Sequence, residues 1–204
     1  MVLVVTGGIG SGKTSVCSIL ERSYGCRIYD ADSRAKALYE EYPELMASIE
    51  AGLDCRISDV QGRLVPSLLA DRIFRDRKAL ETVEGLLFPY LMKDFMRFSA
   101  AAVGHVVFES ATILDKPYFN GLGDVVLIVD APVHLRVDRA CARDGSDAER
   151  VYDRIRNQSS RTSQINDGRK YYTIENDGTI EELEVKLAEV MESVIGKSQT
   201  IENR

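Results

Sequence analysis

The sequence predicts an α/β fold in which helices flank a parallel sheet of five strands. Short apolar runs alternate with segments of helical periodicity, and the first apolar run, residues 2–5, leads through a glycine-rich turn into a helical pattern that ends near Tyr24. Later apolar runs at 105–109 and 124–130 each end in an acidic residue. An unbroken apolar run is typical of a strand buried on both faces of a parallel sheet, where helices join the strands.

The remaining elements follow from periodicity and from turn residues. The expected strands are 2–5, 27–29, 105–109, 124–130 and 171–175. We expect strand 27–29 to lie beside strand 2–5. From 33 to 103 the pattern is helical, with helix starts near Ser33, at Pro43, at Pro66, shortly before Leu80 and after Pro89. Capping boxes at 146–149 and 179–182 predict two more helix starts.

The glycine-rich turn fits a phosphate-binding loop. Residues 7–14 read Gly-Gly-Ile-Gly-Ser-Gly-Lys-Thr, which satisfies the G-x-x-x-x-G-K-[S/T] pattern with a strand before it and a helix after it. Lys13 would reach the phosphates of a nucleoside triphosphate, and the Thr14 hydroxyl would ligate Mg²⁺. The alternative is a tight turn that is merely rich in glycine. The residues expected to bind the nucleotide here are Gly8, Ile9, Gly10, Ser11, Gly12, Lys13, Thr14 and Ser15.

Two carboxylates follow the strand expected at 27–29. Asp30 and Asp32 would emerge at its carboxyl end, where ligands bind in open parallel sheets. An aspartate there can instead cap the helix that begins near Ser33. Glu109, at the end of another strand, could hold water on Mg²⁺ or simply lie on the wall of the crevice.

Arginines concentrate between residues 136 and 169, in a chain whose net charge is −6. One interpretation is a solvated helix face crossed by ion pairs. The other is a mobile lid whose arginines neutralise a transferring phosphoryl group. The arginines are Arg136, Arg139, Arg143, Arg150, Arg154, Arg156, Arg161 and Arg169.

Composition excludes several classes. A chain of 204 residues with 45% hydrophobic content fits one domain with a modest insertion. A pI near 5.1 argues against a nucleic-acid binder. No apolar run is long enough for a signal peptide or a membrane span, so we expect a cytoplasmic protein without membrane contact. The four cysteines lack C-x-x-C spacing and are expected to be reduced.

A D-x-x-G sequence at 59–62 suggests a GTP-dependent switch. No apolar strand precedes it, however, and no N-K-x-D sequence that would read guanine follows. The switch therefore stays a minor alternative.

Taken together, these residues make the sequence similar to dephospho-coenzyme A kinases along nearly its whole length. The pieces that carry the resemblance are 6–13, 30–32, 62–64, Arg139, 143–144, 154–158, Arg161 and 176–178. The resemblance implies a P-loop kinase-like fold in a single domain, 1–204. It comprises a core of 1–32, 104–140 and 170–195, a helical acceptor-binding insertion at 33–103 and a lid at 141–169.

The resemblance also implies an activity: ATP phosphorylates the ribose 3′-hydroxyl of dephospho-CoA. Asp32 would then accept the hydroxyl proton, while Arg139, Arg143 and Arg161 would surround the nucleotide phosphates. The implied partners are small molecules only, and the chain would be a monomer or a weak oligomer. A related kinase with another hydroxyl acceptor, and a nucleotide-binding regulator without catalysis, are the alternatives.

Four positions depart from the family's usual pattern. Phe88 stands where a histidine is common, Pro66 where an arginine is common, Gln164 replaces a lid arginine and Tyr172 replaces an acidic residue. The resemblance therefore implies an altered set of acceptor contacts, whereas the ATP-binding residues are intact.

Overall fold

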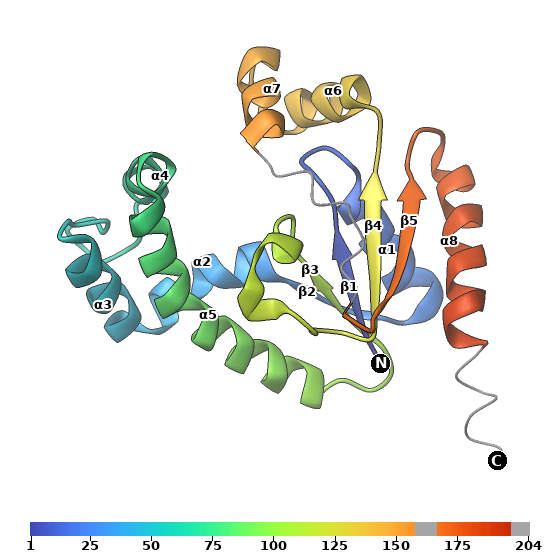
Figure 1. Ribbon diagram of the computed structural model, residues 1–204, viewed down its shortest axis with the longest axis horizontal. Helices are drawn as coiled ribbons and strands as arrows, with labels where there is room; N and C mark the ends of the chain where they lie inside the picture. Colours follow the sequence, from blue (N-terminus) through green and yellow to red (C-terminus); the bar gives the residue numbers. More distant parts are fainter. Residues whose placement is uncertain (158–166, 197–204) are drawn as a thin grey trace. The chain divides into compact units, whose positions relative to one another are not determined.

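A computed structural model describes residues 1–157 and 167–196 (Figure 1). The chain divides into two compact units. The first comprises Met1–Ile28 with the part after residue 102, and the second is Tyr29–Ala102. The boundary falls inside the second strand.

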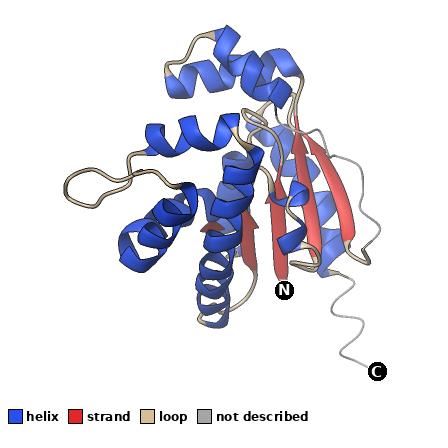
Figure 2. Ribbon diagram, turned by 60° about the vertical axis from the view of Figure 1, so that its left-hand side comes forward, coloured by secondary structure: helices blue, strands red, loops and turns tan. Residues whose placement is uncertain are grey.

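A five-stranded sheet forms the centre of the first unit, as expected (Figure 2). Its strands stand in the order β2-β3-β1-β4-β5, and the pairs β1–β3, β1–β4 and β4–β5 are parallel. The bounds are β1 Val2–Thr6, β2 Arg27–Asp30, β3 Val106–Glu109, β4 Val125–Asp130 and β5 Lys170–Glu175.

The expectation that β2 lies beside β1 was wrong, since β3 takes that position. The reason is that β3 is more apolar than β2. The first three residues of β3 are fully buried, whereas only one of the four residues of β2 is. Burial favours the more apolar strand in the centre of the sheet and leaves the more polar strand at its edge.

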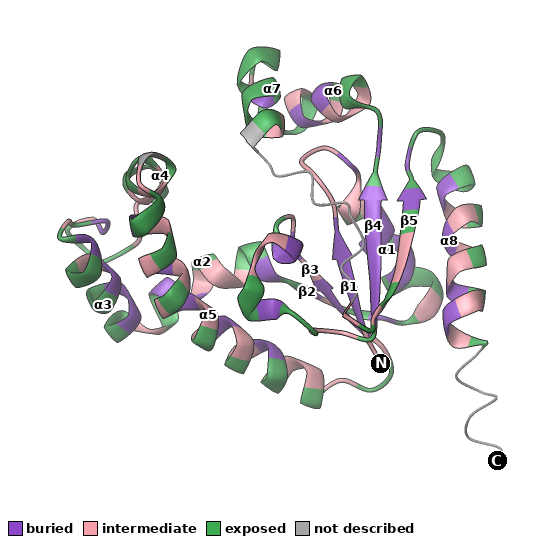
Figure 3. Cartoon of the chain, in the orientation of Figure 1, coloured by how far each residue is buried: buried purple, intermediate pink, exposed green. Residues whose placement is uncertain are grey.

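Two helices share an apolar core with one face of the sheet. These are α1, Lys13–Tyr24, and α8, Ile180–Ile195. Leu3 and Val5 of β1 pack with Leu20 of α1 and Leu187 of α8, and all four are completely buried (Figure 3). The capping box predicted at 179–182 is confirmed, because Thr179 and Glu182 bond reciprocally.

Helices α6, Val133–Asp144, and α7, Ala148–Asn157, follow β4. They form a small apolar cluster of Val137, Ala140 and Val151, on which Ile9 of the phosphate loop packs. The capping box predicted at Ser146 was wrong. The carboxylate of Asp147 accepts the bond from the Arg150 N–H instead, at 2.9 Å, because it is the residue directly before the helix. Two short 3-10 helices, Ile113–Asp115 and Pro117–Phe119, connect β3 to β4.

The second unit is helical, with α2 Ala31–Glu41, α3 Pro43–Leu53, α4 Pro66–Arg75 and α5 Arg77–Ala100. Pro43 and Pro66 occupy first-turn positions, as expected.

Pro89 does not begin a new helix, contrary to expectation, but lies inside α5. It and Gly85, whose carbonyl loses its intrahelical donor, are both exposed, so water can satisfy that carbonyl. On the opposite face the buried stripe Val83, Leu87 and Leu91 continues past the proline. The packing of this stripe therefore outweighs the tendency of proline to break a helix.

Within the part of the chain that the structure describes, no helix combines the length and the apolar character needed to cross a membrane.

Candidate active site

The phosphate loop runs from the end of β1 to the first residue of α1. Gly10 and Gly12 have φ values of 73° and 97°, in the left-handed region. Space also requires glycine at both positions. A Cβ on Gly10 would lie 2.1 Å from the carbonyl oxygen of Arg136, and one on Gly12 would lie 1.9 Å from Nδ2 of Asn176. The loop is therefore pressed closely against its surroundings.

Helix α1 begins without a side-chain cap, because its N-cap residue is Gly12. The amides of its first turn, which contains Thr14 and Ser15, therefore have no acceptor from the capping residue. A phosphate group would satisfy such amides and also gain from the positive end of the helix. Thr14 is exposed and Ser15 half-buried. These residues fit a phosphate ligand.

The Lys13 ammonium group folds back over the loop. Its Nζ donates to the carbonyl oxygen of Gly7 at 3.1 Å and to that of Gly8 at 3.5 Å. The loop thus places a positive charge directly beside its own backbone. Phosphate oxygens, which carry negative charge, would compete strongly with these neutral carbonyls for the ammonium group.

Two arginines of α6 face the loop. Nε of Arg136 donates to the carbonyl of Ile9 at 3.0 Å. Nη1 of Arg139 donates to the carbonyl of Asn176 at 2.9 Å and lies 3.9 Å from the position of a Cβ on Gly12. Both side chains are half-buried. The α6 helix therefore brings positive charge to the edge of the loop.

Arg143 lies at the end of α6 and is exposed. It makes two hydrogen bonds to the carboxylate of Asp144, at 2.7 and 3.0 Å, and Arg154 approaches the same carboxylate at 3.5 Å. The bonds from Arg143 hold the pKa of Asp144 below its usual range. Arg150 and Arg156 also pair with nearby carboxylates. In this structure these four arginines lie on exposed helix faces, whereas Arg136 and Arg139 contact the site.

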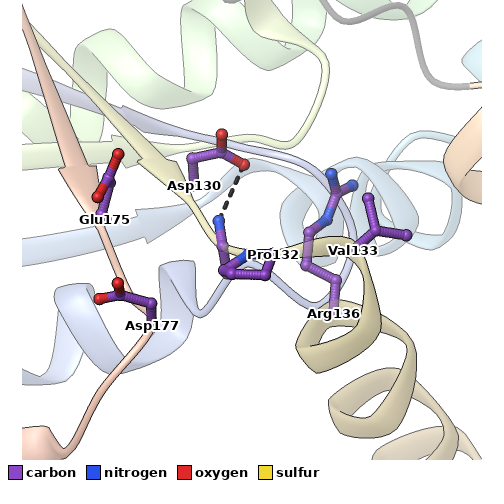
Figure 4. A pocket seen from close by; sticks show the side chains of 7 residues that line it. Asp130, Pro132, Val133, Arg136, Glu175 and Asp177 are labelled. Atoms are coloured by element: carbon purple, nitrogen blue, oxygen red, sulfur yellow. Dashed lines mark hydrogen bonds between the residues drawn. The ribbon is translucent and has the colours of Figure 1, made fainter.

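A cavity of about 400 Å³ adjoins α6 where β4 and β5 end (Figure 4). Arg136 belongs both to this cavity and to the support of the loop. Asp130 accepts a bond from the N–H of Ala131, and a hydrogen bond from Lys186 lowers the pKa of Asp177. Carboxylates and carbonyls in such a hollow can accept hydrogen bonds from the amino groups of a ligand. The lining residues are Asp130, Ala131, Pro132, Val133, Arg136, Glu175 and Asp177.

The two candidate carboxylates have different surroundings in the second unit. Asp30 is the N-cap of α2, and its side chain accepts bonds from the N–H of Ser33 at 3.0 Å and from its hydroxyl at 2.5 Å. The capping alternative thus describes Asp30. Helix α2 begins earlier than expected, so Asp32 lies in its first turn, where it is exposed.

The structure also shows where two other candidates from the sequence lie, Glu109 and Asp59. Glu109 ends β3 opposite Val5 of β1. In the 59–62 turn, the Asp59 carboxylate accepts bonds from the amides of Gln61 and Arg63, both at 2.9 Å. The Asp59 carboxylate therefore stabilises the turn, and these bonds give no support to the GTP-dependent switch. Arg161 and Gln164 lie outside the described residues.

Sequence reasoning named 176–178 only as part of the family resemblance and gave Asn176 no role, and it missed the support that Arg136 gives to the loop. Asn176 is only 6% exposed, and its Nδ2 donates to the carbonyl of Ser11 at 2.9 Å. Besides the resemblance at 176–178, its position directly after a strand that ends at the ligand edge was an available signal. Arg136 lies one helical turn before Arg139, so it shares a helix face with a residue that was predicted.

A comparison with protein families shows to which family the chain belongs. Residues 1–182 match the family model described as dephospho-CoA kinase. The chain belongs to the dephospho-CoA kinase family. It is accordingly a nucleotide-binding kinase with a P-loop kinase-like fold, and the match covers the phosphate loop and the whole second unit.

Individual relatives of known name agree with this family assignment. The dephospho-CoA kinase of Porphyromonas gingivalis is 37% identical over 159 residues, which are 78% of each chain. That of Thermobifida fusca is 33% identical over 193 residues, covering 93% of this chain and 94% of its own. Among solved structures, the protein TT1252 from Thermus thermophilus has a TM-score of 0.74 at 29% identity, covering 95% of this chain and 97% of its own.

Proposed function

We propose that this kinase transfers the γ-phosphoryl group of ATP to the ribose 3′-hydroxyl of dephospho-CoA, forming coenzyme A. The observation that carries the proposal is the family match, because it runs from the phosphate loop through the second unit rather than over the loop alone. A loop by itself indicates phosphate binding but not the acceptor. No observation favours the alternatives of a different acceptor or a regulator without catalysis.

The loop residues bind the triphosphate in this proposal. Gly8, Ile9, Gly10, Ser11 and Gly12 would offer backbone N–H groups, and the first turn of α1 would add those of Lys13, Thr14 and Ser15. The support is the uncapped start of α1 and the left-handed backbone of Gly10 and Gly12. Lys13 would exchange the carbonyls of Gly7 and Gly8 for phosphate oxygens.

We propose Mg²⁺ as the metal, held by the hydroxyl of Thr14. That hydroxyl is exposed in the first turn of α1, and oxygen is the ligand atom that Mg²⁺ prefers. When bound, Mg²⁺ neutralises charge on the phosphate oxygens. Glu109, at the end of β3, would join through water.

Asp32 is our candidate for the group that orients the acceptor hydroxyl and takes its proton. It lies exposed in the first turn of α2, and the neighbouring Asp30 caps that helix. Arg139, Arg143 and Arg161 would stabilise the charge of the transferring group. The hydrogen bond of Arg139 beside the loop supports its role, and Arg143 would have to exchange Asp144 for phosphate.

The remaining proposals concern the acceptor-binding segment, the lid, the nucleoside cavity, and the location and oligomeric state of the protein. We propose that 33–103 binds the acceptor and that 141–169 acts as a lid over ATP. We also propose that the cavity beside Arg136 receives the nucleoside of ATP, because it shares that arginine with the loop. The protein is proposed to act in the cytoplasm, where ATP is abundant, as a monomer or weak oligomer without nucleic-acid or membrane partners.

An acceptor panel tests the function. ADP release would be measured with ATP, Mg²⁺ and either dephospho-CoA, adenosine, shikimate or gluconate. We expect dephospho-CoA to give the highest kcat/KM, with a KM raised by the departures at Pro66 and Phe88. A higher kcat/KM for another hydroxyl compound would replace the proposed acceptor.

A further inference from the structure

Two carbonyl groups of the phosphate loop are held from outside by side chains of other elements. The carbonyl of Ser11 accepts the bond from Nδ2 of Asn176 at 2.9 Å, and that of Ile9 accepts the bond from Nε of Arg136 at 3.0 Å. Asn176 follows β5, whereas Arg136 belongs to α6. The loop is therefore fixed at two alternate peptide units by residues more than a hundred positions away.

These bonds determine the direction of two N–H groups. A trans peptide unit is planar, so its carbonyl and its N–H point in opposite directions. Because the Ser11 carbonyl points to Asn176, the N–H of Gly12 points away from that side chain. By the same geometry, the N–H of Gly10 points away from Arg136. Rotation of either peptide would bring an oxygen, instead of an N–H, toward a bound phosphate.

Asn176 is itself rigidly held. Its backbone N–H donates to the carbonyl of Asp130 at 2.7 Å, and its own carbonyl accepts the bond from Arg139 at 2.9 Å. The residue is 6% exposed. One buried asparagine thus connects the end of β4, the loop and an arginine of α6.

We infer that Asn176 and Arg136 are positioning residues that keep the loop in its anion-binding conformation. Asn176 acts through the Ser11 carbonyl and also orients Arg139, whereas Arg136 acts through the Ile9 carbonyl. The inference rests on the proposed binding of ATP by this loop, but not on the identity of the acceptor. Asparagine suits its position because its amide donates a hydrogen bond, whereas an aspartate would set a carboxylate oxygen against the Ser11 carbonyl.

The test compares Asn176→Asp and Arg136→Met with wild type. Arg136→Met keeps an unbranched stem and removes the donor. Matched controls are Asn120→Asp, on an exposed turn, and Arg22→Met, whose side chain pairs with Glu184 on the surface. The readouts are the Kd of ATP by calorimetry, the KM of ATP and of dephospho-CoA, and the melting temperature without ligand.

Arg136→Met removes a hydrogen bond donated by a charged guanidinium, so it should weaken ATP binding about ten- to hundredfold. Asn176→Asp should raise the Kd about ten- to hundredfold, since two acceptors then face each other. The KM of dephospho-CoA should change less than twofold in both variants. The controls should match wild type.

Two outcomes would overturn the inference. One is a lowered melting temperature with an unchanged Kd of ATP in both variants, which would make the two residues merely structural. The other is an equal rise in the KM of both substrates. If Asn176→Asp does not fold, Asn176→Ala, which also removes the amide donor, takes its place in the comparison. Failure of wild type to bind ATP would instead contradict the proposed function itself.

Discussion

The carboxylate of Asp30 accepts a hydrogen bond from the backbone N–H of Ser33 at 3.0 Å, two residues beyond the start of α2. This bond assigns Asp30 to the helix cap, whereas Asp32 lies exposed in the first turn of α2. The cap is the role that the structure shows for Asp30, and Asp32 is our proposed proton acceptor.

The first prediction ranks these two carboxylates. Asp32→Asn preserves shape but removes the proposed proton acceptor, so kcat should fall about 10²–10⁴-fold while the Kd of ATP stays constant. Asp30→Asn should cost much less in kcat, because an asparagine side chain also caps helices. Steady-state kinetics of both variants, with Asp54→Asn as the control at an exposed α3 terminus, gives the comparison. The reverse ranking would assign the base to Asp30.

The second prediction concerns Lys13. Lys13→Ala removes the ammonium group that now contacts Gly7 and Gly8, so kcat should fall by at least about 10²-fold. The far-ultraviolet circular dichroism spectrum should not change, since the neighbouring residues form α1. Lys78→Ala, on an exposed part of α5, is the matched control. Near-normal turnover in a folded Lys13→Ala protein would show that this loop does not bind the transferring phosphate.

The third prediction separates backbone strain from the shape of the loop. Gly10→Ala and Gly25→Ala both place alanine at positive φ, which costs about 1–2 kcal/mol of stability. A Cβ on Gly10 would also meet the Arg136 carbonyl at 2.1 Å, whereas one on Gly25 meets nothing within 4 Å. Only Gly10→Ala should therefore weaken ATP binding, measured by calorimetry. Equal ATP affinity in the two variants would refute the close fit of the loop.

The fourth prediction concerns the pH dependence of stability in the second unit. Burial alone would raise the pKa of Asp94, but hydrogen bonds from Arg34 and Tyr29, at 2.8 and 2.7 Å, outweigh it and lower the pKa. A carboxylate with a lowered pKa in the folded state adds stability above its unfolded pKa of about 3.9. That stability is lost as the pH falls through the folded pKa.

Asp94→Asn should therefore lower the free energy of unfolding by about 1–3 kcal/mol at pH 7. The difference from wild type should shrink below about pH 4, where the wild-type carboxyl takes up a proton. Urea unfolding at several pH values measures both quantities. A difference that stays constant between pH 7 and pH 3 would mean that the charge of Asp94 is not responsible.

Local patterns made β1, the glycine-rich loop and α1 predictable. Strand, glycines, lysine and helix start are consecutive in the sequence, so residues 2–24 could be read without knowing the rest of the chain. The capping box at Thr179 is equally local. The continuity of α5 past Pro89 was not predictable in this way, because it depends on the packing of Val83, Leu87 and Leu91 against the rest of the unit.

Contacts between residues far apart in the sequence could not be predicted either. The pairing of β3 with β1 depends on which strand is the most apolar, which a strand-by-strand interpretation does not compare. Asn176 lies 165 positions from Ser11, and only the fold brings its amide to the loop. Arg136 was visible as part of an arginine-rich helix, but its bond to Ile9 was not.

The most direct test of the proposed function is the stoichiometry of the two products. Wild-type protein and Lys13→Ala would be incubated with ATP, Mg²⁺ and dephospho-CoA, and ADP and coenzyme A would be quantified separately by chromatography. The proposed function predicts equal amounts of ADP and coenzyme A from wild type, with both products reduced at least about 10²-fold in the variant. ADP formed without coenzyme A would contradict it.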